Sequence, residues 1–214
     1  MTHSSSAHGT FDTLERDLTE IFGGRLQSLV RYGSKAALLH TLAVVDSLTA
    51  ADLAACAARV AAWHDEHLAT PLVLPATELQ QSLDVFPFEL SAIIADHVVL
   101  SGRNPFAGLR VEPSDLRWAC EVQARSHLLH LREGYIEARG RDDALSVLIV
   151  NSAPAWASLQ ENIGRLEHKT AVTDEVTRLV GVKEISNEEA SRIFPKYLQD
   201  AERLTQYVDG WTAK

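Results

Sequence analysis

The sequence predicts an α+β fold in which a small mixed β-sheet with flanking helices is followed by a C-terminal helical bundle. The first observation is that apolar runs of strand length recur in the first half of the chain, at 29–32, 38–45, 71–74 and 98–100. The second is that, after Glu112, apolar residues follow a helical period throughout. Together they predict two domains, 11–112 and 113–214. Residues 1–10, which are polar and rich in serine and histidine, predict a disordered tail before them.

The first domain is predicted to begin with an amphipathic helix that the Gly23-Gly24 pair ends. Two strands follow and meet at a tight Gly33-Ser34 turn. The elements expected in this domain are a helix at 11–22, strands at 29–34 and 38–45, an alanine-rich helix capped by Ser47 or Thr49 and running to about Leu68, a strand at 70–74, one or two helical turns at 76–82, a strand at 83–90 interrupted by Pro87, and a strand at 98–100.

The second domain is predicted to be an up-and-down bundle of four amphipathic helices with short connections. Its first helix is capped by Ser114 or Asp115 and carries the apolar stripe Leu116, Cys120, Ala124, Leu128, Leu131 and Tyr135. The others are expected at 142–166, interrupted or kinked at Pro154, at 173–180 ended by Gly181, and from Pro195 onward, preceded by a Ser-x-x-Glu capping box at Ser186.

Composition and charge restrict the classes of partner. The chain is 46% apolar and 23% charged, which is typical of a soluble globular protein. Its net charge of −9 leaves no basic excess to attract phosphate backbones or anionic lipids. No run approaches the ~20 apolar residues of a membrane span, and the N-terminus lacks an apolar signal-peptide segment. We therefore expect a cytoplasmic protein with no nucleic-acid or membrane partner.

Cysteines and histidines do not predict a metal or redox site. Cys56 and Cys120 lie in helical patterns and are expected to be small buried core residues. His64 and His67 stand three apart, a spacing that suits a metal pair, but without a third ligand the favoured interpretation is two exposed histidines near a helix end. The common dinucleotide, P-loop, metalloprotease and hydrolase motifs do not occur in the sequence.

The Gly33-Ser34 turn is the first candidate site. A glycine at the end of a strand lets backbone N–H groups approach an anion closely, and the serine adds a hydroxyl donor. The pair thus suits a phosphate cradle, with an ordinary turn as the alternative interpretation.

A helix, then a strand ending in Tyr32-Gly33-Ser34, resembles the start of the nucleotidyltransferase superfamily, which has the DNA polymerase β-like fold. Two later stretches, Asp84 to Leu90 and Val98 to Phe106, are similar to ordered motifs of a bacterial group in that superfamily whose substrate is unassigned. The resemblance covers the first domain, implies a bacterial source, and implies two metal-binding carboxylates on the second strand and a third farther along. The two positions on the second strand hold Leu38 and His40 here.

The absence of the two metal-binding carboxylates affects the predicted activity directly. Nucleotidyl transfer needs Mg²⁺, and Mg²⁺ needs hard oxygen ligands. Leucine offers no ligand, and imidazole suits zinc better than magnesium. Glu89 or Asp84 is the best candidate for the third carboxylate. The alternative is structural, with Asp84 in a turn or cap and Glu89 in a hydrogen bond or ion pair.

We therefore expect a nucleotidyltransferase-like protein that is inactive or strongly impaired and binds a ligand or a partner, with no cofactor and no metal. Its expected partners are a nucleotide or other small molecule, a protein, or a second copy of the chain in a homodimer. The alternative is an active enzyme that uses Mg²⁺ to move a nucleotide from a nucleoside triphosphate (NTP) to a small molecule or protein. In that case Gly33 and Ser34 hold the phosphates, and Glu89 or Asp84 helps to bind Mg²⁺.

Overall fold

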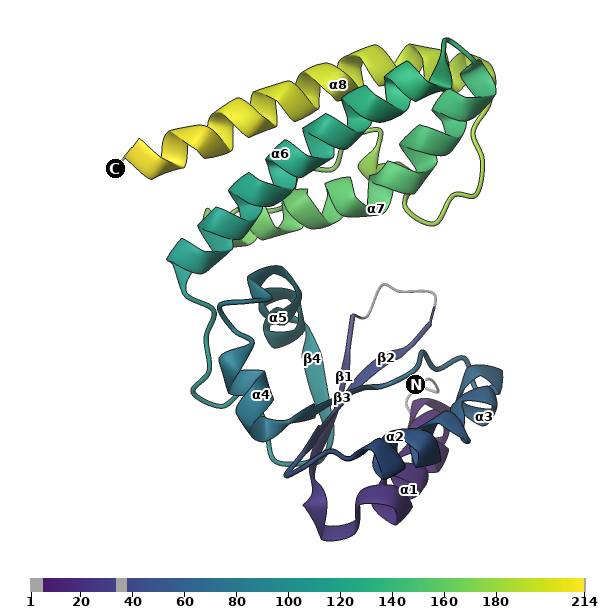
Figure 1. Ribbon diagram of the computed structural model, residues 1–214, viewed down its shortest axis with the longest axis vertical. Coiled ribbons are helices and arrows are strands. Elements are labelled where there is room, and N and C mark those ends of the chain that lie inside the picture. The colour runs from purple at the N-terminus through teal and green to yellow at the C-terminus, as the bar shows by residue number, and fades with distance from the viewer. Residues whose placement is uncertain (1–5, 34–37, 214) are drawn as a thin grey trace. The chain divides into compact units, whose positions relative to one another are not determined.

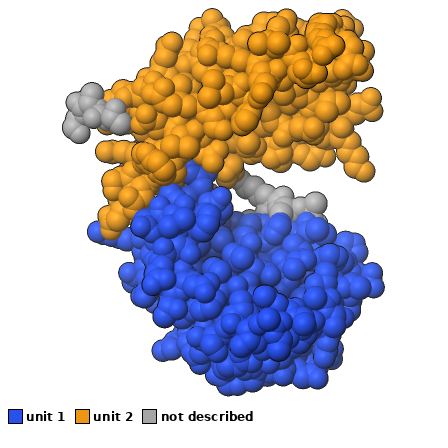
Figure 2. Space-filling view, viewed as in Figure 1, with its two compact units in different colours: residues 1–111 blue, residues 112–214 orange. Residues whose placement is uncertain are grey.

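The computed structural model describes residues 6–33 and 38–213 (Figure 1). The chain divides into two compact units, residues 1–111 and 112–214 (Figure 2). The first contains a four-stranded sheet with helices on both faces, and the second is helical. The predicted α+β class is confirmed.

The sheet has the strand order β3-β2-β1-β4 and is mixed. The central strand β1 runs antiparallel to both neighbours, β2 and β4, whereas β2 and β3 are parallel. A helical crossover joins the parallel pair, as parallel neighbours require. The four strands confirm the four predicted apolar runs: β1 (Leu26–Tyr32), β2 (His40–Val45), β3 (Leu72–Pro75) and β4 (His97–Gly102).

Alternation along the strands builds two cores, one on each face of the sheet. Leu29 points into a core formed with α1 (Ser6–Phe22), α2 (Ala50–Ala57) and α3 (Val60–Asp65). Its neighbour Val30 points into a second core formed with α4 (Ala76–Gln81) and α5 (Pro87–Ala95). Because both faces are covered, apolar residues stand at consecutive positions where the strands are buried, at Leu29 and Val30 of β1 and from Leu42 to Val45 of β2.

The α1 helix begins at Ser6, inside the stretch predicted as a disordered tail. The alanine-rich helix expected to reach Leu68 is two helices instead, α2 and α3. Thr49 caps α2 in a complete capping box with Asp52, as predicted for one of the two candidate caps. The buried Trp63 of α3 donates its indole N–H to Asp17 over 3.0 Å, which anchors this second segment on α1.

The prediction of a strand at 83–90 is wrong, because this stretch forms a turn followed by α5. Pro87 does not interrupt a strand but occupies the first position of the helix, where its missing N–H has no intrahelical partner to lose. Leu90 and Ile93, three residues apart, then face the second core.

The second unit contains three long helices rather than the predicted four. α6 (Pro113–Ala138), α7 (Asp142–Leu166) and α8 (Asn187–Asp209) pack against one another. The helix predicted at 173–180 is only a 3₁₀ turn, Thr177–Leu179, closed by reciprocal hydrogen bonds between Asp174 and Thr177 (2.8 and 2.9 Å). The α8 helix continues through Pro195, which is exposed, so water can bind the carbonyl that the proline leaves unpaired.

Short 3₁₀ segments, Gly23–Arg25 and Gly210–Ala213, end α1 and α8. None of the helices among the described residues is both long and apolar enough to cross a membrane.

Candidate functional site

The predicted turn begins at Gly33, directly after β1. Gly33 has a φ of 69°, in the left-handed region that favours glycine. Its backbone N–H donates to the carbonyl oxygen of Asp96 over 3.3 Å, so this donor already has a protein partner. Ser34, the other half of the predicted phosphate cradle, lies outside the described residues.

Beside Gly33, three aromatic side chains form a row across the sheet. Tyr32 is the register partner of His40 on β2 and of His97 on β4, so the three side chains share one face. The rings of Tyr32 and His40 have centroids 5.6 Å apart. Burial raises the pKa of Tyr32, which keeps its hydroxyl protonated and able to donate at neutral pH.

His97 is held in one orientation by two contacts. Its Nδ1 lies 3.0 Å from the carbonyl oxygen of Ile94, and because a carbonyl only accepts, Nδ1 carries the proton. Its ring packs edge-on against Phe106 with centroids 4.8 Å apart. In a neutral His97 the lone pair is therefore on Nε2. The row thus offers aromatic faces and imidazole nitrogens rather than carboxylate oxygens.

Asp84 and Glu89 lie on the turn before α5 and in the first turn of α5, and both are exposed. The helix dipole stabilises a carboxylate in the first turn of a helix, so the presence of Glu89 at this position does not require a bound ligand. The structure places neither residue on a strand. Among the described residues, no three His, Cys, Asp or Glu side chains are grouped so as to hold a metal ion.

The opposite face of the same corner has a half-open depression of about 370 Å³. Arg31, which precedes Tyr32 and therefore points to the other side of the sheet, lies in it. The remaining lining residues are Phe11, Asp12 and Glu15 of α1, Leu39, and Val98, Val99 and Leu100 of β4. Arg31 is not among the site residues predicted from the sequence, although an arginine within an apolar strand is a usable signal.

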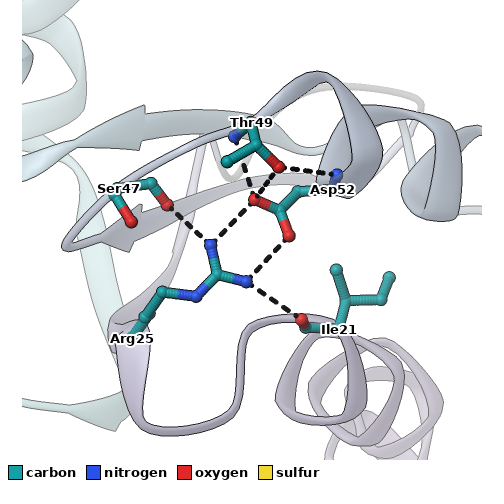
Figure 3. Close-up of polar contacts among 5 residues, drawn as sticks. All are labelled: Ile21, Arg25, Ser47, Thr49 and Asp52. Carbon is teal, nitrogen blue, oxygen red and sulfur yellow. Dashed lines mark hydrogen bonds and ion pairs between the residues drawn. The ribbon is translucent and has the colours of Figure 1, made fainter.

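The polar cluster around Arg25 has a structural role (Figure 3). Arg25 donates to both carboxylate oxygens of Asp52 at 2.8 Å and to the carbonyl oxygens of Ile21 and Ser47 at 3.3 and 3.2 Å. The hydrogen bonds from Arg25 are the main reason why the pKa of Asp52 lies well below its usual range, and hydrogen bonds from Thr49 lower this pKa further. The cluster joins the end of α1 to the start of α2, and its donors and acceptors satisfy one another.

In the helical unit, a polar cluster connects all three long helices. His127 Nε2 of α6 lies 2.6 Å from the hydroxyl of Tyr197 on α8, which donates to Ser152 Oγ on α7 over 3.0 Å. The His127 ring stacks on Trp156, whose indole N–H donates to Asp174 over 2.7 Å. Burial, assisted by His130, lowers the pKa of His127 to about 4, so its imidazole is neutral at neutral pH.

The two predicted cysteine environments are confirmed, since Cys56 and Cys120 are both free and buried. His64 and His67 are exposed, as the favoured interpretation expected, and His64 Nε2 lies 3.1 Å from Thr70 Oγ1.

Comparison with known proteins adds no family: no family model matches the chain, and no curated protein matches it significantly.

Proposed function

We propose that this protein is a nucleotidyltransferase-like binding module that does not perform magnesium-dependent nucleotidyl transfer. The observation that supports the proposal is the chemistry at the start of β2, next to Gly33. Leu38 is exposed there and offers no ligand, and His40 packs beside Tyr32 in the sheet register. A magnesium ion that bridges phosphates needs oxygen ligands at such a corner.

The exposed carboxylates of Asp84 and Glu89 do not replace that pair in the proposal. Both are exposed and lie on or just before α5, whereas the pair that they would replace belongs to the start of β2. The active-enzyme alternative requires at least one of them to bind the metal, so the two hypotheses differ in a measurable way.

Restoring the carboxylates tests the proposal. We expect the wild-type chain to show no Mg²⁺-dependent ATP binding by calorimetry and no transfer of labelled nucleotide. The double substitution Leu38→Asp/His40→Asp is expected to create Mg²⁺-dependent stabilisation, seen as a rise in melting temperature with MgCl₂ and ATP, because a bound ligand stabilises the folded state by mass action.

The control is the pair Asp84→Asn/Glu89→Gln, which is expected to leave the wild-type behaviour unchanged. Nucleotide transfer by the wild-type chain that this pair abolishes would establish the active-enzyme alternative instead.

The helical unit supports the binding role with an exposed apolar stripe on α6. Trp118, Val122, Leu129 and Ile136 are 64, 43, 63 and 74% exposed. At 100° per residue they fall within about 40° of each other, along about 27 Å of helix. The core does not account for this exposed stripe, because the buried residues of α6 lie on the opposite side of the helix. These buried residues are Leu116, Cys120, Ala124, Leu128, Leu131 and Ala138.

We propose that the occupant of this stripe is a second copy of the chain. The two arginines that interrupt the stripe are neutralised within their own unit, Arg125 by Asp209 and Arg132 by Glu202, each at 2.8 Å. Two copies therefore meet without repulsion between these charges. Antiparallel pairing of α6 with its copy sets Trp118 against Ile136 of the partner subunit, which makes the face self-complementary.

Sedimentation velocity over a range of concentrations tests the dimer. We expect the wild-type chain to dimerise and Trp118→Gln/Leu129→Gln to remain monomeric with unchanged stability, because both side chains are exposed in one copy. Val147→Gln, an equally exposed apolar position on α7, is the matched control and should still dimerise. A wild-type monomer at every concentration would exclude this partner.

A further inference from the structure

The depression beside Arg31 has the size and lining of a small-molecule site. Its volume of about 370 Å³ lies within the roughly 300–1,000 Å³ range of ligand pockets. Leu39, Val98 and Leu100 give it apolar surface, and Val98 is 46% exposed although it stands in a strand. A partly solvated apolar surface of this kind gains free energy when a ligand covers it.

Arg31 is the cation in this depression, and it is half-buried. Within the part of the chain that the structure describes, its guanidinium makes no hydrogen bond or ion pair. Other arginines of this unit are used differently: Arg25 binds Asp52, and Arg59 binds Asp17. A half-buried guanidinium with five donors and no described partner is well suited to bind a ligand carboxylate in a bidentate manner.

Acidic groups also line the depression. Asp12 and Glu15, one turn apart on α1, both line it, so its ionised side chains sum to −1 at neutral pH. A simple carboxylate would be attracted by Arg31 and repelled by the two acids. A ligand with both a carboxylate and an ammonium group satisfies both kinds of charge, and an apolar group on the same ligand covers the β4 side chains.

We propose that this depression binds a free α-amino acid with an aliphatic side chain. Arg31 holds the carboxylate, Asp12 and Glu15 hold the ammonium group, and Leu39, Val98 and Leu100 contact the aliphatic group. The site lies on the face of the sheet opposite Tyr32 and His40, so it stands or falls independently of any nucleotide site at Gly33.

Three matched probes test the ligand chemistry by NMR titration of the full-length chain. L-Leucine carries both charges, 4-methylpentanoate lacks the ammonium group, and 3-methylbutylamine lacks the carboxylate. We expect saturable shifts of the amide signals of Arg31, Val98 and Leu100 with leucine. Each of the other probes should bind about tenfold or more weakly, because it leaves one charged hydrogen-bonding side of the site unpaired.

Two variants test the residues. Arg31→Gln should weaken leucine binding about tenfold or more while removing its preference over 3-methylbutylamine, and Asp12→Asn/Glu15→Gln should remove its preference over 4-methylpentanoate. Arg16→Gln removes an exposed positive charge from the same helix outside the depression and should bind leucine like the wild type. The inference is overturned if the folded wild-type chain gives no shifts with millimolar leucine, or if Arg31→Gln binds it unchanged.

Discussion

Replacing Gly102 by alanine is expected to destabilise the α/β unit by about 2–5 kcal/mol, from a left-handed backbone penalty of about 1–2 and overpacking of about 1–3 kcal/mol. Gly102 ends β4 with a φ of 75°, opposite Ser28 of β1. An added Cβ would overlap the carbonyl oxygen of Gln27 and lie 2.9 Å from the Ser28 Cα. Those atoms are backbone, so relief requires the β1–β4 pairing itself to shift.

Gly33 provides the matched control for this prediction. It has a similar φ of 69°, but a Cβ there would meet nothing within 4 Å. Gly33→Ala should therefore cost only the backbone term, about 1–2 kcal/mol. Urea unfolding, monitored by hydrogen exchange of peptides from β1 and β4, measures the stability of the α/β unit in both variants without interference from the helical unit. Equal losses for Gly33→Ala and Gly102→Ala would show that the close approach in β4 has no energetic weight.

Sequence patterns were sufficient to predict secondary structure where the apolar pattern of a segment by itself distinguishes a strand from a helix. The strands and α1 were predicted because each has an apolar run of strand length or a helical apolar period within its own segment. The stretch around Pro87 was misassigned because a proline between apolar residues fits either a broken strand or a helix start. The contacts of Leu90 and Ile93 with the core beneath α5, which decide the matter, are tertiary and do not appear in the local pattern.

The same limit applies to α8 and the segment before it. Ser186 caps α8 as predicted, but the helix was expected to restart at Pro195, since proline removes one backbone hydrogen bond. It runs on because Ile193, Phe194 and Tyr197 are all buried against the other helices. Tertiary burial thus outweighs a local helix penalty of about 3 kcal/mol.

The candidate site was less predictable than the fold because it depends on register. Gly33, Ser34 and His40 lie close together in the sequence, but His97 lies 57 positions beyond His40. Only the pairing of Tyr32 with both histidines brings the row together. Arg31 is comparable, because its importance depends on Asp12 and Glu15 of α1 lining the same depression. Cross-strand neighbours cannot be obtained from spacing alone.

The helical unit is expected to lose about 3 kcal/mol of stability between pH 6.5 and pH 4, through His127. Its folded-state pKa is about 4, whereas an unfolded histidine titrates near 6.5. The unfolded chain therefore binds this proton more tightly, so the stabilisation is complete above pH 6.5 and is lost as the pH falls. The groups around the imidazole do not compensate, since Tyr197 and Ser152 are neutral, and Asp174 is engaged by Trp156.

Substitution at two histidines of α6 isolates this effect. His127→Gln, which does not titrate, should make the stability of α6–α8 nearly independent of pH from 6.5 to 4.5, a window above the pKa values of ordinary carboxylates. His130→Gln removes only the smaller of the two causes of the lowered His127 pKa and should keep most of the wild-type slope, because burial is the larger cause. Urea midpoints of the α6–α8 peptides by hydrogen exchange give the profile, and NMR titration of the His127 ring gives its pKa even if a variant folds poorly. A wild-type profile that is flat across this window, or a ring that titrates near 6.5, would mean that His127 is solvated and that the three-helix cluster does not exclude water.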